Sequence, residues 1–481
     1  MKLNATTNKT TTILDTKNNE PIKVVLTRPR MMSSGELPFD SYHRANTLGE
    51  GTYGMVVTVY NDSGDELALK IFEEDEENET MELGTLREIS ILRLLRCSNG
   101  HPNIVELVDV QAAGEEECGN GNLCMAMPLY GMGDLKRAVN RGIISPGAAG
   151  RRQRVEIAYG LLCAVAYLHD NHIIHRDIKS DNVMITLSDD DSGEEIIVPV
   201  LIDFSLAKFL SGPNSVLPPG ATHTGEIGTP TYTSPEVVGK QEYGLKSDLW
   251  SVGVVLLETV IGELTADKEK AAARLIEEKR SSLPKSPFFN LIRGLLEPNV
   301  EDRLSAREAL ALPIFEKFGL KVPPIRIIDI DTAFPASDEE NSENVCNGIS
   351  SNTNGSKAPK KKSLAKQRTL SPRERLIKKL CNEIECKNPK TELAAAAYAR
   401  EMEQLDDELD DIANSQTLLD CVVVASRFYE EELISLKELE EDDGGNYPNF
   451  NDFSIETFCD NERALFMVMD YSLYLRKATY L

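Results

Sequence analysis

The sequence predicts an α+β protein with two lobes, a β-rich N-terminal lobe and an α-rich C-terminal lobe, followed by a separate all-α domain. Short apolar runs rich in β-branched residues surround a glycine-rich stretch near the beginning, and long runs with helical periodicity dominate from residue 151 onward. A length of 481 residues agrees with two or three domains. The expected boundaries are 1–40 for a mostly disordered lead, 41–320 for the two lobes, 321–372 for a linker and 373–481 for the helical domain.

Composition excludes several classes of protein. The formal net charge of −26 argues against general binding to nucleic acid or to anionic membranes. No apolar run is long enough to span a bilayer, and the N-terminus lacks the apolar segment of a signal peptide. The nine cysteines are scattered without zinc-site spacing, which indicates reduced thiols in an intracellular protein of the cytoplasm or nucleus.

The first element with chemical meaning is a glycine pattern formed by Gly49, Gly51 and Gly54. Glycines let the backbone approach phosphate oxygens because no Cβ stands in the way. Such a pattern alone could also be a hairpin turn or a dinucleotide-binding loop. A dinucleotide loop leads directly into a helix, whereas the β-branched and aromatic residues 55–60 predict a strand. The sequence therefore favours a strand–turn–strand hairpin.

The next strand and helix carry a candidate ion pair. Lys70 lies in the otherwise apolar strand 66–71, and Glu88 lies on a helix expected over residues 83–95. An ion pair between the two could hold Lys70 against phosphates. The alternative is an exposed lysine on an edge strand. A further strand is expected over 123–129 and a long helix over 151–169.

Residues 175–182, with the sequence HRDIKSDN, form the stretch around which the chain is organised. Phosphoryl transfer requires mainly positioning and electrostatic stabilisation, so an acid, a cation and a metal ligand on one short loop make chemical sense. The pattern resembles the catalytic-loop motif of eukaryotic protein kinases, and the resemblance implies that Asp177 would accept the proton of a substrate hydroxyl, Lys179 would neutralise charge, and Asn182 would hold Mg²⁺. The alternative is a charged surface turn. Asp203, after a second pair of strands, is a further candidate ligand for Mg²⁺.

These motifs follow one another in an order that resembles the catalytic domain of eukaryotic protein kinases over residues 42–318, most closely that of the cyclin-dependent kinases. The resemblance implies a two-lobed protein kinase fold, serine/threonine kinase activity on protein substrates, and ATP and Mg²⁺ as cofactors. It leaves open whether Met125 or Met127 lies next to the adenine site. The residues that it places around ATP are Leu48, Gly49, Gly51, Gly54, Val56, Ala68, Lys70, Glu88 and Met184, with Asn182 and Asp203 as metal ligands.

The same resemblance implies regulatory and structural roles. Thr224 matches the activating phosphorylation site, with Thr222 as the nearest alternative, and Thr52 and Tyr53 match inhibitory phosphorylation sites. Thr229 matches a threonine that contacts the catalytic aspartate and lysine. Two further matches concern the framework of the site: an aspartate that anchors the catalytic loop, and a glutamate paired with an arginine. These residues are Asp248, Glu236 and Arg303.

Two residues depart from the family pattern. Ser205 stands where the family has glycine, and glycine permits positive φ angles that serine resists. This change places the switching of the loop in doubt and slightly favours a rival hypothesis, a catalytically weak pseudokinase scaffold that only binds. Thr233 stands where cyclin-dependent kinases have arginine, so a preference for Ser-Pro or Thr-Pro substrates does not carry over.

The C-terminal third shows helical patterns over 393–405, 417–429 and 461–474. Together these resemble the middle of a cyclin box, in which Arg427 and Glu462 match the lysine and glutamate that grip the kinase partner. The alternative is an unrelated helical bundle. The resemblance implies either an intramolecular cyclin-like activator or a need for a separate cyclin. In the linker, the basic run 360–362 could be a nuclear-localisation signal or part of a solvated tether.

Overall fold

The computed structural model describes the larger part of the chain. The described residues are 10–14, 21–25, 43–51, 54–60, 64–72, 82–112, 123–145, 147–189, 193–210, 214–217, 230–264, 269–328, 372–386, 389–404 and 415–429, with the single positions Leu436, Leu439, Glu441, Tyr447, Phe458, Glu462 and Leu465.

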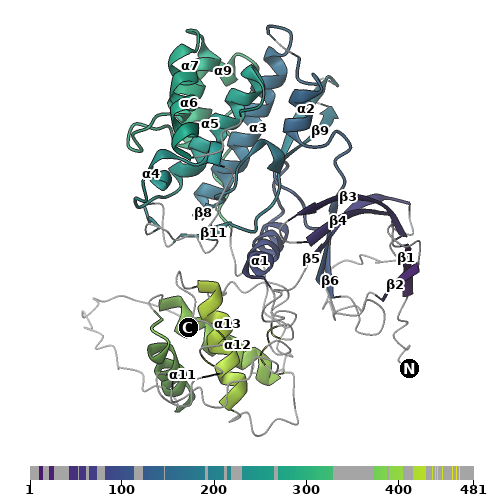
Figure 1. Cartoon of the computed structure of the whole chain (residues 1–481), viewed down its shortest axis with the longest axis vertical. Helices are drawn as coiled ribbons and strands as arrows, with labels where there is room; N and C mark the ends of the chain where they lie inside the picture. Colours follow the sequence, from purple (N-terminus) through teal and green to yellow (C-terminus); the bar gives the residue numbers. More distant parts are fainter. Residues whose placement is uncertain are drawn as a thin grey trace, which may run out of the picture.

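The N-terminal lobe is an antiparallel sheet with one helix against it (Figure 1). Among the described residues the sheet has five strands in the order β3-β4-β5-β7-β6, so that β5 lies at its centre. The strands are β3 (His43–Gly51), β4 (Gly54–Tyr60), β5 (Glu66–Phe72), β7 (Leu123–Pro128) and β6 (Asp109–Ala112), and the helix is α1 (Leu83–Cys97). The glycine pattern therefore lies at the β3–β4 turn, as the strand–turn–strand prediction requires.

Two further strands lie within the stretch expected to be mostly disordered. Thr10–Leu14 (β1) and Pro21–Val25 (β2) pair in an antiparallel hairpin. The sequence analysis expected a mostly disordered lead over residues 1–40 and did not predict this hairpin. Both segments are rich in β-branched residues, which favour extended backbone when a partner strand is present.

The C-terminal lobe packs helices around α3 (Arg151–Asp170) and α5 (Lys246–Ile261), whose side chains are mostly buried. Two small antiparallel strand pairs, β9 with β10 and β8 with β11, belong to this lobe; Figure 1 draws β9 beside α2, and β8 and β11 on the side of the lobe that faces α1. The remaining elements are α2 (Leu135–Asn140), β8 (Ile173–Ile174), η1 (Ser180–Asn182), β9 (Val183–Asp189), β10 (Glu195–Leu201), β11 (Lys208–Phe209), η2 (Pro230–Tyr232), α4 (Pro235–Val238), α6 (Glu269–Ser282), α7 (Pro287–Leu295), α8 (Ala306–Leu310) and α9 (Pro313–Glu316).

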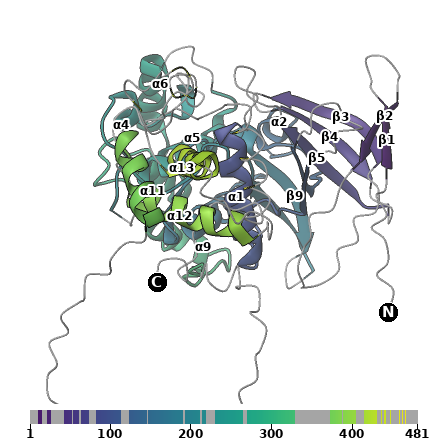
Figure 2. The same ribbon diagram turned by 90° about the horizontal axis from the view of Figure 1, so that it is seen from below.

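Three helices follow from the C-terminal third: α11 (Pro372–Glu383), α12 (Pro389–Gln404) and α13 (Ser415–Tyr429). They pack on one another, and α13 also contacts α1. Figures 1 and 2 show α13 beside α1 in two perpendicular views. Buried apolar side chains of these helices belong to the same continuous cluster as those of α1 and the C-terminal lobe. Of the helix expected over 461–474, the structure describes only Glu462 and Leu465.

Residues 317–328 lead away from α9 without regular secondary structure. The sequence analysis began the linker at residue 321, but the segment up to Ile328 is hydrogen-bonded to the C-terminal lobe. Composition could not indicate this, because the partners lie on α3 and α8, far away in the sequence. The described helices include none that is long and apolar enough to cross a membrane.

Candidate active site

Lys70 and Glu88 are brought together by the packing of α1 on the central strand β5. The Nζ atom of Lys70 lies 2.6 Å from Oε2 of Glu88, and the glutamate is buried. Burial raises the pKa of Glu88 above its ordinary value, although the charge of Lys70 opposes this effect. The backbone N–H of Phe204 also donates to Glu88. The pair that the sequence analysis proposed is therefore formed, and it joins the sheet, α1 and the 203–205 segment.

The two methionines of β7 both pair with residues of the central strand, but they differ in burial. Met125 is paired with Lys70 and Met127 with Ala68, on the central strand β5. Met125 is fully buried in the main core, whereas Met127 is partly exposed. This difference favours Met127 as the residue that borders the open side of the sheet. Val56, paired with Lys70 from the other neighbouring strand, is also partly exposed.

Asp248 on α5 holds the loop of residues 175–182 in place. The carboxylate accepts hydrogen bonds from the backbone N–H groups of His175 and Arg176, each at 2.9 Å, and it contacts the ring of His169 at 2.9 Å. Burial alone would raise the pKa of Asp248, but the hydrogen bonds and charges of His169 and His175 together outweigh it, so the pKa is lowered. A charged carboxylate thus fixes two consecutive backbone groups directly before Asp177.

Asp177, Lys179 and Asn182 meet within hydrogen-bond distance. Lys179 Nζ lies 2.7 Å from Oδ2 of Asp177. Asn182 Nδ2 donates to the same oxygen and to the backbone carbonyl of Asp177, both at 2.9 Å. Burial raises the pKa of Asp177, against the opposing charge of Lys179. A carboxylate made more basic by burial is suited to accept a proton.

Asp203 follows β10 and lies near Lys70. Its φ angle is +64°, in the left-handed region. Ser205 is not among the residues with positive φ, so the serine does not meet the strain that the family glycine suggested. Instead its Oγ donates to Asp203 Oδ1 at 2.6 Å. Burial by itself would raise the pKa of Asp203, but Lys70 and this hydrogen bond outweigh it and the pKa is lowered.

Asn182 and Asp203 offer oxygen ligands of the kind that Mg²⁺ prefers. Both hydrogen bonds that the Asn182 side chain makes to Asp177 use Nδ2, which leaves its amide oxygen available. The low pKa of Asp203 keeps its carboxylate charged. Magnesium usually takes only one or two protein ligands beside water and substrate phosphates, so these two residues fit.

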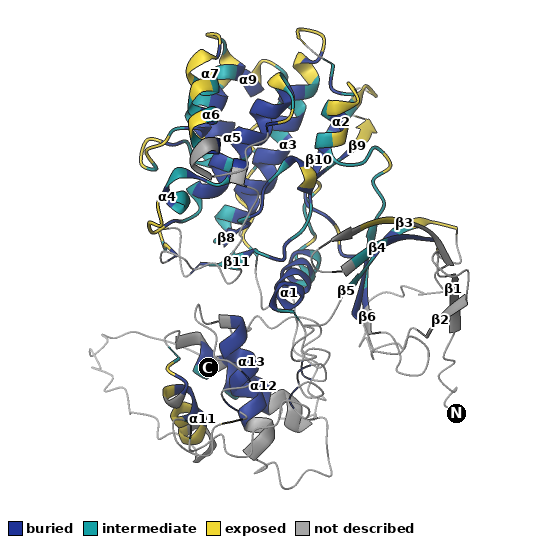
Figure 3. Ribbon diagram, viewed as in Figure 1, coloured by how far each residue is buried: buried dark blue, intermediate teal, exposed yellow. Residues whose placement is uncertain are grey.

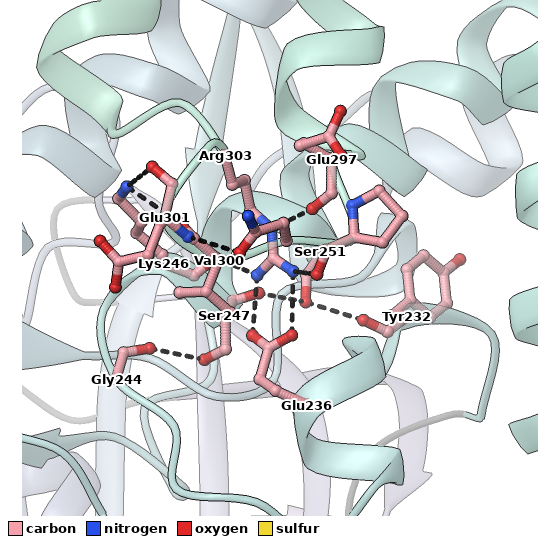
Figure 4. A network of polar contacts seen from close by, with 12 residues as sticks. Tyr232, Glu236, Gly244, Lys246, Ser247, Ser251, Glu297, Val300, Glu301 and Arg303 are labelled. Carbon is pink, nitrogen blue, oxygen red and sulfur yellow. Dashed lines mark hydrogen bonds and ion pairs between the residues drawn. The ribbon is translucent and has the colours of Figure 1, made fainter.

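Figure 4 shows a buried ion pair between Arg303 and Glu236 within a network of polar contacts. Arg303 donates to both carboxylate oxygens of Glu236, at 2.7 and 2.9 Å. It also donates to the backbone carbonyls of Glu297 and Lys246, and its guanidinium lies 5.3 Å from the ring centre of Trp250. Arg303 is 1% exposed and Glu236 5%. The pair therefore ties α4 to the residues that precede α8.

Comparison with known sequences agrees with this geometry. The sequence model of the family described as "Protein kinase domain" matches residues 42–315, which is more than half of the chain. The chain belongs to the protein kinase family. The match covers both lobes and all the site residues named so far.

Individual relatives of this kinase cover the same region. CBL-interacting serine/threonine-protein kinase 9 of Arabidopsis thaliana is 30% identical over 62% of this chain and 64% of its own length. Cell division control protein 2 homolog 3 of Trypanosoma brucei brucei is 33% identical over 52% of this chain and 72% of its own. Serine/threonine-protein kinase DCLK1 of Rattus norvegicus is 30% identical, with shares of 58% and 61%. The match thus spans less than two thirds of the first and third relatives.

The kinase has polar residues at its site that the sequence analysis missed. Ser180 Oγ and Tyr232 Oη are 2.8 Å apart, and Tyr232 donates to Glu258 Oε2 at 2.8 Å. The other oxygen of Glu258 accepts from the backbone N–H of Leu264. Burial raises the pKa of both Tyr232 and Glu258. These residues belong to three separate segments, so spacing along the chain offered no way to find the network.

The structure describes some of the remaining residues that the sequence analysis named and leaves others undescribed. Gly51 and Gly54 are paired in the β3–β4 hairpin, and Leu48 is exposed on β3. Met184 on β9 is paired with Asp134, which caps α2 by accepting from the Arg137 N–H. The predicted phosphorylation sites and the threonine expected beside Asp177 lie outside the described residues; they are Thr52, Tyr53, Thr222, Thr224 and Thr229.

Proposed function

We propose that the chain is an ATP- and Mg²⁺-dependent serine/threonine protein kinase that phosphorylates protein substrates. The observation that carries the proposal is the convergence of five residues from four segments of the chain on one place. Lys70 and Glu88 are paired at 2.6 Å, while Asp177 and Asn182 share a hydrogen bond at 2.9 Å. Asp203 lies close enough to Lys70 for the lysine charge to lower its pKa. This set supplies what phosphoryl transfer requires.

Each residue has one role in this proposal. Lys70, held by Glu88, contacts the α- and β-phosphates, and the β3–β4 glycine turn covers them. Asn182 and Asp203 hold Mg²⁺, which neutralises charge on the phosphates. Asp177 accepts the proton of the substrate hydroxyl, and Lys179 stabilises the negative charge of the transferred group.

A pseudokinase scaffold is the second candidate, which Ser205 favoured at the level of sequence. The hydrogen bond from Ser205 to Asp203 weakens that argument, because it keeps the carboxylate charged rather than removing it. Retention of all five residues also favours catalysis over binding alone.

The test is transfer of radiolabelled phosphate from ATP to a generic basic protein by the full chain. We expect transfer that requires Mg²⁺ and stops when the ion is chelated. Nucleotide binding, measured with a fluorescent ATP analogue, separates the alternatives if transfer is absent. Binding without transfer would support the scaffold, and absence of both would contradict any nucleotide-dependent function.

We further propose that the C-terminal helices form an all-α, cyclin-like module that holds α1 in its own chain. Leu86 and Ser90 lie two residues on either side of Glu88, so they face the opposite side of α1, yet both are fully buried. Figure 3 draws α1 as buried along its length, with α13 next to it. Because α13 contacts α1, we infer that the module accounts for part of this burial.

Arg427 and Glu462, which the cyclin-box resemblance matches to residues that grip the kinase partner, contact each other. Arg427 Nη1 lies 3.8 Å from Glu462 Oε1, and both residues are buried. The Arg427 guanidinium is also 5.8 Å from the ring centre of Phe458. The two residues that the cyclin-box resemblance singled out are thus close in space, although they lie far apart in the sequence.

Truncation tests the module. A chain ending at residue 335 keeps all site residues and lacks α11–α13. We expect it to transfer phosphate at least about tenfold more slowly than the full chain, the ratio for about 1.4 kcal/mol of lost stabilisation. Supplying residues 373–481 as a separate polypeptide should restore part of the rate. Equal rates for the two chains would contradict activation by the module.

A further inference from the structure

The segment from Leu320 to Ile328 runs from the C-terminal lobe back to α1, and we propose that it is a latch that positions α1. In this role Arg326 and Ile328 are positioning residues, which act on catalysis through α1 and its Glu88. The proposal rests on the proposed kinase function and assigns regulation of the same site.

The first half of the latch is bound to the C-terminal lobe. Tyr159 on α3 donates its hydroxyl to the backbone carbonyl of Lys321 at 2.7 Å. Arg307 on α8 donates to the carbonyls of Pro323 and Pro324. Two consecutive prolines restrict the backbone, so this half reaches α3 in an extended conformation at low cost in conformational entropy.

Asn171, directly after α3, binds the second half of the latch through both ends of its amide. Its Nδ2 donates to the Arg326 carbonyl at 2.9 Å, and its Oδ1 accepts from the Ile328 N–H at 2.6 Å. Asn171 is itself buried. One side chain therefore fixes the register of residues 326–328 against the lobe.

Arg326 bridges from this point to the end of α1. Its guanidinium lies 5.3 Å from the ring centre of Tyr167 and donates to the carbonyl of Ser98 at 3.3 Å. Ser98 is the C-terminal cap of α1, where a positive charge is favourable to the helix dipole. Tyr167 in turn stacks on His101, at 5.2 Å between ring centres. Burial and the charge of Arg326 lower the pKa of His101 to about 4, so His101 is neutral near pH 7.

Ile328 makes the apolar contact. It packs against Leu94 of α1, as do Cys97 of α1 and Phe209 of β11. Leu94 is completely buried. Strand β11 pairs with β8, which directly precedes the catalytic loop, through Phe209 and Ile173. The latch thus ends at a point where α1 meets the strand pair beside the loop.

The side chains at the end of the latch differ in exposure. Ile325 and Ile327 are 66% and 67% exposed, and Arg326 is exposed as well, although its guanidinium reaches the ring of Tyr167 on α3. Ile328 is partly buried against Leu94 of α1. This difference supplies a matched control, since Ile327 and Ile328 are identical neighbours that differ in exposure.

The latch acts through the rigidity of α1. Glu88 and Leu94 lie on one continuous helix, so a shift at Leu94 moves Glu88 away from Lys70. The Lys70–Glu88 pair must be in place for phosphoryl transfer. Loss of the latch should therefore weaken ATP use without removing any group from the active site.

The experiment compares Ile328→Ala with Ile327→Ala in the full chain. We measure kcat, KM for ATP, and hydrogen–deuterium exchange of residues 83–97. We expect Ile328→Ala to lower kcat/KM for ATP roughly tenfold and to speed exchange in α1, because a partly buried side chain is truncated at a contact of α1. Ile327→Ala should stay within about twofold of the parent chain in activity and exchange.

The outcomes separate this proposal from the kinase function. Equal exchange in residues 83–97 for the two variants would overturn the latch, whether or not the protein is active. A parent chain that transfers no phosphate would overturn the kinase function, while exchange would still decide on the latch. If Ile328→Ala does not fold, Arg326→Gln replaces it, and unchanged α1 exchange in that variant would overturn the latch in the same way.

Discussion

Asp177→Asn is expected to lower kcat for phosphate transfer by a factor of ~10²–10⁴, the range for loss of a general base. Asparagine has the shape of aspartate and retains an oxygen that can accept from Lys179 or Asn182, so the loop should keep its structure. Asparagine lacks the carboxylate, however, and we propose that this carboxylate accepts the substrate proton. Burial raises the pKa of the Asp177 carboxyl group. The affinity for ATP should change little, because Lys70, Glu88 and Asp203 remain.

Asp181→Asn serves as the matched control for this experiment. Asp181 lies in the same loop, but its side chain is exposed and pairs with Lys136 at 3.4 Å. Transfer of radiolabelled phosphate should proceed within about twofold of the parent rate, as for most surface substitutions. The proposed role of Asp177 would be wrong if both variants lost activity equally, or if Asp177→Asn kept the parent rate.

The second large effect is expected in stability. Arg303→Met should lower the free energy of unfolding by ~3–5 kcal/mol, the cost of leaving one partner of a buried ion pair without the other. Glu236 would remain buried without the two hydrogen bonds at 2.7 and 2.9 Å that Arg303 donates. The backbone carbonyls of Glu297 and Lys246 would lose the same donor.

Denaturation by urea, followed by tryptophan fluorescence, measures this loss. Trp250 is the single tryptophan of the chain and lies against Arg303, so its emission reports on the lobe in question. Arg152→Ala is the control, because Arg152 makes an ion pair with Glu156 on the surface, with a side chain 49% exposed. Such a pair is worth about 1 kcal/mol or less. Adding Glu236→Gln to Arg303→Met should recover part of the loss, and equal losses for Arg303→Met and Arg152→Ala would contradict the proposed role of burial.

Local patterns were predictable because they depend on residues that are close in the sequence. The strand–turn–strand at the glycines follows from the β-branched residues after Gly54, and the bounds of α1 follow from apolar spacing. The loop 175–182 is short, so its motif alone predicts that Asp177 and Asn182 lie close together. Strands β1 and β6 were missed, because a strand of four or five residues depends on its partner strand for stability.

The amino-acid sequence by itself therefore determined the family, the order of the motifs and the chemistry that each residue type offers. Only the tertiary structure decided which distant groups meet: Ser205 on Asp203, and residues 320–328 along α3. The contact of α13 with α1 likewise joins segments that are far apart in the sequence. The physical reason is that propensity and periodicity act within a few residues, whereas burial and pKa shifts depend on packing between segments far apart in the chain.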